Sequence, residues 1–264
     1  MILEEVHKLE AFELELTKFN SKRALSEEVK QLEVLEVGNC KVLIDTKSPK
    51  SMYYNRVKGF SLEDKDQLHK ILAIYEKENI SPCFDMSPLH VNNEIANILT
   101  ENGFMLSDQL VFLKWSQDQP YFSNYNQKAL TISEITKDNV KELIQLIVNS
   151  NDLKLSDDVI HRQSHYFYQP NFKNYIAYVD NNPAALASIF IHQNKAYFAN
   201  AYTFPEFRGK GCQHALLHHR LMVTKQLGIS MVYSDVEFGS ISHNNLRKFA
   251  FQQLYMNSFW IRKA

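Results

Sequence analysis

The sequence predicts a mixed α/β (α+β) chain of two domains. Segments whose apolar residues recur at helical spacing alternate with short apolar or alternating segments that indicate strands. The length of 264 residues is enough for two domains of ordinary size. Between two series of such segments lies Ser116–Lys128, which is polar and contains Pro120, so it is the best linker in the chain. We expect domains over residues 1–120 and 130–264, joined by a linker over 121–129.

The first half is expected to open with an amphipathic surface helix and to continue with strands and two further helices. Gly38-Asn39 joins two strand-like segments and is a hairpin signal. Ser61 is expected to cap the second helix, and Asn92 or Asn93 the third. We interpret Tyr53–Phe60 as a turn-rich connection. The expected helices are Glu4–Phe19, one from Ser61 through Tyr75, and one through Ile95, Ile98 and Leu99 that Asn102-Gly103 closes. The expected strands are Leu32–Val37, Cys40–Ile44, Cys83–Met86 and Leu110–Trp115.

The second half is expected to run strand, two helices, three strands, long helix, strand, helix, strand. The expected helix caps are Thr136 or Asp138, Ser156 and Ser242. Asp180–Pro183 is rich in turn-forming residues and separates two of the strands. The expected strands are Leu130–Ile135, Tyr175–Val179, Ala184–His192, Ala196–Tyr202, Ile229–Val236 and Tyr255–Arg262, and the expected helices are Val140–Ile147, Val159–Tyr166, His214–Leu227 and Ser242–Phe249.

The overall composition excludes several classes of protein. The formal net charge is -1, so nothing global indicates a nucleic acid or an anionic membrane as partner. No apolar run approaches the roughly 20 residues of a membrane span, and the N-terminus is acidic rather than signal-like. The three cysteines (Cys40, Cys83 and Cys212) lie far apart, with neither metal nor disulfide spacing. We therefore expect a cytoplasmic protein without a bound metal.

One stretch, Thr203–Gln213, combines the features of an anion-binding loop. It leaves a strand at Pro205, which cannot donate to a sheet ladder, and enters a helix. Gly209 and Gly211 permit unusual backbone angles and a close approach of a ligand to the main chain. The first N–H groups of a helix lack internal partners and carry partial positive charge. Arg208 and Lys210 add formal charge, so we expect a phosphate ligand here.

The loop does not match the two commonest phosphate motifs. A Walker A loop requires G-x-x-x-x-G-K-[ST], which is absent. A Rossmann fingerprint requires a third glycine where this chain has His214. It also belongs in an opening βαβ unit, whereas this loop lies far into the chain.

The hexapeptide Arg208–Gln213 resembles the signature [QR]-x-x-G-x-[GA] of the GNAT superfamily of acyl-CoA N-acyltransferases, with Gln213 in place of the final Gly or Ala. The order of elements over residues 130–264 also resembles a GNAT domain. A second segment, Gly239–Phe251, looks like the family's Ser-x-x-Asn-x-x-Arg-x-Gly-Phe segment. There Ala250 replaces the Gly, and Leu246 stands where many members have a Tyr.

The resemblance implies a C-terminal GNAT domain with a mixed, mostly antiparallel sheet flanked by helices. The first half ends as helix, Gly-Phe, strand, as a GNAT domain does, but it has no basic Gly-containing loop. It resembles a degenerate GNAT-like copy that has lost its cofactor site. An unrelated α/β domain is an equally open interpretation.

Coenzyme A is the ligand that the resemblance implies. Its pyrophosphate would lie on backbone N–H groups, and its pantetheine arm would pair with the end of the preceding strand like a short extra strand. A later helix would contact the arm from the other side. The implied binding residues are Tyr202, Thr203, Phe204, Arg208, Gly209, Lys210, Gly211, Cys212, Gln213, Ser242 and Asn245.

The acid and the base stay open at this point. Members of the family commonly use a Tyr to protonate the departing thiolate, and Tyr255 or Tyr233 is a substitute for the missing one. Many members carry a basic Glu on the strand before the loop, but that position offers Asn200, which cannot take a proton. Asp235, Glu237 or a chain of waters is the alternative base.

Other readings of the basic stretch carry less weight. Cys212 lies at a helix start, where a thiol pKa falls, but it has no second Cys and no His–Asx partners, which favours packing. His214, His218 and His219 lack a carboxylate motif of the H-E-x-x-H kind, which favours surface histidines.

We therefore predict an acetyl-CoA-dependent N-acetyltransferase that acts on a primary amine of a small molecule, an amino acid or a peptide. The amine would attack the thioester directly. The alternative is an acyl-CoA-binding or protein-interaction module of the same fold without turnover. A different phosphate-ligand enzyme is disfavoured by the failed motifs. A homodimer stays open.

Overall fold

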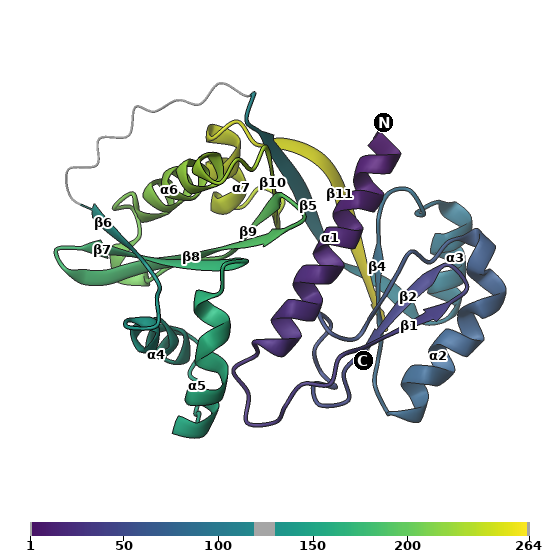
Figure 1. Cartoon of the computed structure of the whole chain (residues 1–264). Coiled ribbons are helices and arrows are strands. Elements are labelled where there is room, and N and C mark those ends of the chain that lie inside the picture. Colours follow the sequence, from purple (N-terminus) through teal and green to yellow (C-terminus); the bar gives the residue numbers. More distant parts are fainter. Residues whose placement is uncertain (1, 119–129, 263–264) are drawn as a thin grey trace. The chain divides into compact units, whose positions relative to one another are not determined.

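The computed structural model describes residues 2–118 and 130–262 (Figure 1). The predicted linker over 121–129 therefore lies outside the described residues. Contacts divide the chain into two compact units. The first unit comprises Met1–Ala24, Glu28–Phe112 and Leu254–Ala264, and the second comprises Leu25–Glu27 and Leu113–Gln253. The expected last strand, Tyr255–Arg262, thus belongs to the first unit by its contacts, whereas the predicted boundary places it in the second domain.

The first unit is a helix-flanked sheet with strand order β1-β2-β3-β4-β11-β5, in which β5 belongs to this unit up to Phe112 and β11 from Leu254. The predicted hairpin is confirmed: β1 and β2 are antiparallel, with Val37 opposite Cys40. Strands β3 and β4 are parallel, and β11 runs antiparallel to β4, with Ser258 opposite Met86. The elements are α1 (Ile2–Lys22), β1 (Glu33–Val37), β2 (Cys40–Ile44), β3 (Arg56–Lys58), the 3-10 helix η1 (Leu62–Gln67), α2 (Leu68–Lys77), β4 (Cys83–Met86), α3 (Asn93–Glu101), β5 (Phe104–Ser116) and β11 (Gln252–Arg262).

The two faces of this sheet are covered differently. On one face, Val57 and Phe84 belong to an apolar core shared with α2 and α3, in which the Phe84 ring lies 4.9 Å from the Phe104 ring. Side chains alternate along a strand, so the neighbours of Val57 point to the opposite face. There Arg56 donates to Glu13 on α1. Helix α1 is therefore held to the sheet by ion pairs.

Strand β3 corrects the interpretation of Tyr53–Phe60 as a turn-rich connection. All three residues of β3 are buried, but two of them are charged, so no apolar alternation indicates a strand. Their charges are compensated by carboxylates from α1 and β4, which only the fold brings near. Ser61 occupies the N-cap position of η1 as expected, but its hydroxyl donates to Asp64 instead of accepting from the helix backbone. Asn92 does cap α3, accepting from the Ile95 amide.

The second unit is a five-strand array in the order β10-β9-β8-β7-β6. The pairs β6–β7, β7–β8 and β8–β9 are antiparallel, and β9 and β10 are parallel. The elements are β6 (Leu130–Glu134), α4 (Val140–Ser150), α5 (Asp157–Ser164), the 3-10 helix η2 (His165–Tyr168), β7 (Phe172–Val179), β8 (Asn182–His192), β9 (Lys195–Thr203), the 3-10 helix η3 (Pro205–Phe207), α6 (Cys212–Gln226), β10 (Met231–Glu237) and α7 (Ile241–Lys248).

The predicted element order and the mixed, mostly antiparallel sheet flanked by helices are confirmed. Two of the predicted caps are wrong. Asn139 rather than Thr136 or Asp138 occupies the N-cap position of α4. Ser240 rather than Ser242 caps α7, accepting from the His243 amide. Each cap lies one to three residues from the predicted one because several polar residues compete at each helix start. None of the helices in the described ranges is both long and apolar enough to cross a membrane.

Candidate active site

Strands β9 and β10 of the second unit pair over only part of their length. Their parallel register covers three residue pairs and ends at Tyr197 opposite Tyr233. Both strands continue, β9 to Thr203 and β10 to Glu237. Beyond the last pair, the Ser234 hydroxyl donates to the Phe198 carbonyl at 3.0 Å in place of a backbone donor. The strands therefore no longer pair here, and a ligand that pairs like a strand would meet the main chain of β9 beyond this point.

A β-bulge lies on β9 beyond its last pair with β10. Leu186 of β8 is opposite Tyr202, whereas Ser188 is opposite Ala199, so β9 carries one extra residue between these pairs. Asn200, one of the two residues in the bulge, has a φ of 50°, a left-handed angle that Asn tolerates better than most residues. A bulge bends a strand and interrupts its ladder. Asn200 was expected only as a residue unable to accept a proton; its backbone role was not predicted.

The loop after β9 is ordered by its own backbone. The Phe204 amide donates to Ala184 of β8, and a short 3-10 turn closes with the Phe207 amide on the Phe204 carbonyl at 2.9 Å. Gly209 and Gly211 have φ angles of 78° and 81°. An L-residue with a side chain pays roughly 1–2 kcal/mol to adopt such an angle. Both glycines predicted from the sequence are therefore required by the backbone of the loop.

Helix α6 begins directly after this loop, with Gly211 as its N-cap residue. The Gly211 carbonyl accepts from Ala215, which is the first intrahelical bond. The amides of Cys212 and Gln213 belong to the first turn and have no acceptor within the helix. They are the donors that an anion would use, together with the positive end of the helix dipole.

The charges of the loop are exposed. Arg208 and Lys210 are both solvent-exposed, and the Lys210 ammonium lies 4.9 Å from the Phe207 ring centre. Glu206 is exposed nearby, so the three side chains together carry a net charge of about +1. A phosphate at the start of α6 would thus meet one net positive charge besides the helix amides.

Gln213 has a structural role that the sequence did not show. Its side-chain amide donates to the Thr203 hydroxyl at 3.0 Å, which links the start of α6 to the end of β9. Tyr202, Thr203 and Phe204 are all half-buried, and the rings of Tyr202 and Phe204 lie edge to face at 5.3 Å. The residue that departs from the family motif therefore closes the loop across its base.

Cys212 is a packed residue in this structure. It is buried, and burial raises the pKa of its thiol, although Lys210 acts in the opposite direction. The thiol is therefore protonated at neutral pH and lies 3.9 Å from the Phe207 carbonyl oxygen, which it faces as a donor. This agrees with the packing interpretation of the sequence.

Helix α6 is anchored to the sheet by a buried arginine. The Arg220 guanidinium donates to the Ser188 carbonyl at 3.1 Å and lies 4.3 Å above the Phe198 ring. Burial lowers the pKa of Arg220 to about 9, and Tyr175 acts in the opposite direction. Ser188 lies next to the bulged segment and also receives a bond from Asn200 at 3.4 Å. Ser188 thus contacts both the middle of α6, through Arg220, and the bulge, through Asn200.

Three of the four predicted acid–base candidates share one side of β10. Tyr233, Asp235 and Glu237 alternate along the strand, so they point to the same face. Tyr233 is buried, Asp235 is half-buried and Glu237 is exposed at the strand end. Tyr255 lies on β11 in the first unit, where its ring stacks on Phe112 at 4.9 Å. Its role at this site stays a prediction.

Sequence reasoning missed Tyr197 as a partner for this face. Its hydroxyl donates to Asp235 at 2.6 Å across the two parallel strands. Tyr197 and Asp235 are 38 residues apart in the chain, so only their placement on adjacent strands brings them together. A phenol bonded to a carboxylate is a pair through which a proton can pass.

Helix α7 follows β10. Ser242 is exposed and Asn245 half-buried, while Leu246, which stands where many family members have a Tyr, is buried in the helix contact. Ala250 has a φ of 62°, which lies in the left-handed region that favours glycine. The backbone at residue 250 thus has an angle that Gly adopts more readily than Ala.

The histidines of α6 form no metal site. No group of three or more potential metal ligands occurs among the described residues. Burial lowers the pKa of His214, His218 and His219, and neighbouring positive side chains lower it further, although Glu134 acts in the opposite direction on His219. They are therefore neutral at pH 7.

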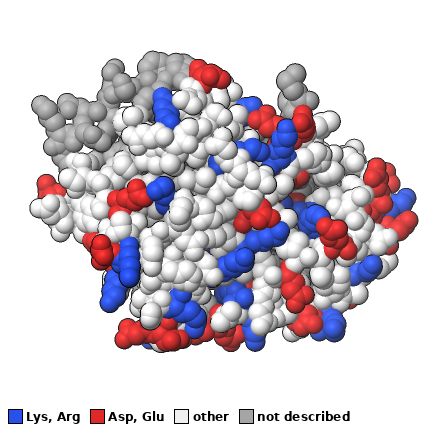
Figure 2. Space-filling model, viewed as in Figure 1, with Lys and Arg blue, Asp and Glu red and all other residues white. Residues whose placement is uncertain are grey.

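Charges of both signs are intermixed on the molecular surface. Figure 2 shows Lys and Arg interspersed with Asp and Glu on the face that it draws. This pattern agrees with the net charge of -1.

No protein-family model matches the sequence, and no curated protein matches it. Solved structures do resemble it. A GCN5-related N-acetyltransferase from Kribbella flavida matches with a TM-score of 0.65 and 13% identity over 89% of this chain and 90% of that chain. A functionally unknown conserved protein from Staphylococcus epidermidis gives a TM-score of 0.63 and 10% identity over 86% of this chain and 92% of that chain.

A third similar structure is described as a tandem protein of the same kind. It is a tandem GNAT protein from the clavulanic acid biosynthesis pathway, with a TM-score of 0.58 and 11% identity over 93% of this chain and 86% of that chain. These matches extend over most of the chain, so they include the first unit as well as the second. Both units contain two parallel strands joined by a helix, β3-α2-β4 and β9-α6-β10. The chain therefore has the fold of the GCN5-related N-acetyltransferases.

Proposed function

We propose that the second unit transfers an acetyl group from acetyl-CoA to a primary amine of a small molecule, an amino acid or a peptide. The observation that supports this most is the end of pairing between β9 and β10 before a glycine loop and a helix start. One end of this arrangement suits a strand-like amide arm, and the other suits a pyrophosphate. Coenzyme A has both groups in one molecule.

The binding roles follow from the geometry of the loop. The first-turn amides of Cys212 and Gln213 would donate to the pyrophosphate, with Arg208 and Lys210 adding charge. Main-chain groups of β9 near Tyr202 and Thr203 would pair with the pantetheine amides. Ser242 and Asn245 would contact the arm from α7.

The chemical step is attack of the neutral amine on the thioester carbonyl carbon. A carbon–nitrogen bond forms, the carbon–sulfur bond breaks, and the coenzyme A thiolate leaves. Asp235, bonded to Tyr197, is the proposed acceptor for the proton that the amine loses. Tyr233 is the proposed donor to the thiolate, because it shares the face of β10 with Asp235. Glu237 lies further along that face and would accept the proton if the amine enters from the exposed end.

A second function, acyl-CoA binding without turnover, is favoured by two observations. Leu246 cannot donate a proton, and Asn200 cannot accept one at the positions where many family members have a Tyr and a Glu. The experiment that separates the two functions is thiol release from acetyl-CoA in the presence of a panel of primary amines. Amine-dependent release with formation of the acetylated amine supports the enzyme. A coenzyme A-dependent rise in melting temperature without any release supports the binding module instead.

A further inference from the structure

The first unit has a cavity of about 590 Å³ that the proposed function does not use. Helix α1 forms one wall, with Glu10 and Leu14, and the segments that follow β3 and β4 form the others, with Leu62 and Leu89. Small-molecule sites usually have a volume of roughly 300–1,000 Å³. All the residues that line it belong to the first unit.

The cavity lies where the topology favours ligand binding. Strands β3 and β4 are parallel, and the lining includes Lys58 and Gly59 at the end of β3 as well as His90 after β4. Ligands bind preferentially at the carboxyl ends of parallel strands, beside the helix that joins them. The corresponding position in the second unit is the loop between β9 and α6. The first unit thus keeps a cavity at this place, although it lacks the basic glycine loop.

The helix start beside this cavity is unsuitable for a phosphate. Glu63 and Asp64 lie in the first turn of η1. The Asp64 carboxylate already accepts from the Asn39 amide and from the Ser61 hydroxyl, each at 2.8 Å. Carboxylates at a helix start occupy the position that an anionic ligand would need and repel it. The ligand of this cavity is therefore not expected to carry a phosphate.

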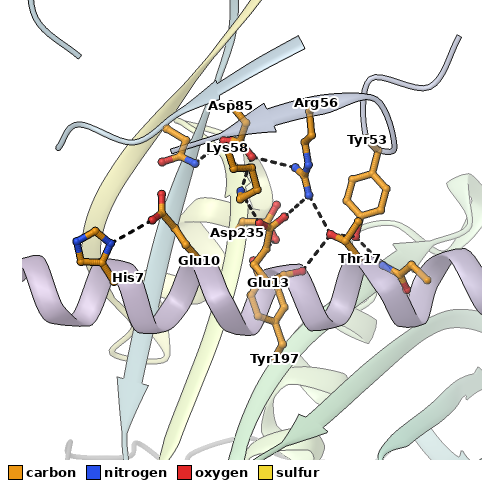
Figure 3. Close-up of polar contacts among 12 residues, drawn as sticks. His7, Glu10, Glu13, Thr17, Tyr53, Arg56, Lys58, Asp85, Tyr197 and Asp235 are labelled. Carbon is orange, nitrogen blue, oxygen red and sulfur yellow. Dashed lines mark hydrogen bonds and ion pairs between the residues drawn. The ribbon is translucent and has the colours of Figure 1, made fainter. Parts of the chain in front are cut away.

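The positive side chains that line the cavity are already neutralised. The Lys58 ammonium is buried and bonded to Glu13 at 2.7 Å and to Asp85 at 2.5 Å (Figure 3). Lys41 forms an ion pair with Glu36. Neither lysine therefore offers an uncompensated positive charge to a ligand.

The Glu10 carboxylate, in contrast, forms an ion pair with His7 at 3.7 Å, and that imidazole is charged only when protonated. The Lys58 ammonium also attracts Glu10, but it is bonded to Glu13 and Asp85, so its single charge is shared among three carboxylates. The Glu10 side chain is only 15% exposed, and Figure 3 shows it rising from α1 on the side of Lys58 and Asp85. A carboxylate in such a place favours a cationic partner, because removal from water strengthens the interaction between unlike charges.

We propose that this cavity binds a small organic cation, a primary amine with an apolar body. The ammonium group would donate to Glu10, and the carbon chain would pack against Leu14, Leu62 and Leu89. The apolar side chains come from three different segments, so they line the cavity on several sides. The proposal rests on the first unit alone and is independent of acetyl transfer in the second unit.

The test is calorimetric titration of the full-length chain with hexylamine, 1-hexanol and hexanoate, which share one carbon chain and differ in charge. Hexylamine is expected to bind, and the other two to bind at least tenfold more weakly. Glu10→Gln keeps the shape of the side chain and removes its charge, so hexylamine affinity is expected to fall 10-fold or more. That factor corresponds to the strength of a hydrogen bond to a charged group, roughly 1.5–3 kcal/mol.

Two further variants serve as a control for charge and as a test of the cavity wall. Glu15→Gln changes another carboxylate of α1, one that bonds to Lys18 and does not line the cavity, and is expected to leave hexylamine affinity unchanged. Ala11→Phe adds a ring at an exposed position of the cavity wall and is expected to reduce binding without disturbing the core. Absence of hexylamine binding at about 10 mM, equal binding of 1-hexanol, or unchanged affinity in Glu10→Gln would each overturn the proposal. Coenzyme A titrated separately reports on the second unit, so the two proposals fail independently.

Discussion

Substitution of Glu13 by Gln tests the ion-pair network that holds α1 to the first unit. The Glu13 carboxylate accepts from Arg56 at 2.6 Å and from Lys58 at 2.7 Å, and all three side chains are less than 10% exposed. Asp85 bonds to the same two cations and to Asn257. Four charges of balanced sign thus share a buried site, which Figure 3 shows between α1 and the strands.

The expected loss of stability follows from two arguments. Removing one partner of a buried ion pair costs about 3–5 kcal/mol, because the remaining charges are left uncompensated. Burial alone would raise the pKa of Glu13, but Arg56 and Lys58 outweigh it and lower the pKa from 4.5 to about 2. A shift of that size corresponds to roughly 3 kcal/mol of folding free energy. The cost of breaking the buried ion pair and the pKa shift thus correspond to about the same loss of stability.

The sign of the pH dependence follows from the direction of the shift. A carboxyl group whose pKa is lowered by folding contributes its stability above the unfolded pKa, and this contribution is lost as the pH falls towards the folded pKa. The free energy of unfolding of the wild type is therefore expected to exceed that of Glu13→Gln by the whole amount at pH 7. This difference is expected to shrink as the pH falls from about 4.5 to about 2.

Urea unfolding followed by circular dichroism measures the effect. Glu15→Gln is the matched control on the same helix, because Glu15 pairs with Lys18 and both side chains are about 40% exposed. Exposed pairs contribute about 0–1 kcal/mol, so the control is expected to stay near the wild type. A loss below about 1 kcal/mol in Glu13→Gln, or a difference that does not change with pH, would refute the reasoning.

Three further substitutions test the second unit. Gln213→Ala removes the bond to Thr203 and is expected to cost about 1 kcal/mol in urea unfolding, while coenzyme A still binds because the backbone N–H remains; loss of binding would show that the side chain itself is needed. Asp235→Asn is expected to lower the rate of thiol release about 100-fold or more with little change in coenzyme A affinity, and an unchanged rate would remove Asp235 as the base. Cys212→Ala is expected to keep thiol release within about threefold of the wild type, because the thiol is buried and protonated. Abolished release in a folded Cys212→Ala variant would instead indicate a covalent intermediate.

The sequence predicted the elements of the second unit well because their signals are local. Glycines at 209 and 211, a proline before them and a continuous helix after them define the loop without any knowledge of the fold. Strand β3 was missed for the opposite reason. Arg56 and Lys58 look like surface residues until Glu13 and Asp85, which are distant in sequence, compensate them.

The details of the candidate site depend on pairing between strands. The bulge at Asn200 is visible only from the register of β9 against β8. The bond between Tyr197 and Asp235 requires that β9 and β10 be adjacent and parallel. Local propensity carries no information about either, because strand pairing is a property of distant segments. The glycine loop and one face of β10 could therefore be predicted from the sequence, but the contacts around them could not.

Coenzyme A binding to a matched pair of glycine variants tests the central claim most directly. Gly209 in the loop and Gly228 beyond the far end of α6 have φ angles of 78° and 69°, and a Cβ at either would meet no atom within 4 Å. Substitution by Ala is therefore expected to cost each about 1–2 kcal/mol of stability through backbone strain. In calorimetric titration we expect coenzyme A to bind the wild type and Gly228→Ala alike, and Gly209→Ala at least tenfold more weakly. Equal affinity in the two variants, or no binding to the wild type at about 1 mM coenzyme A, would contradict the assignment of this loop as the pyrophosphate site.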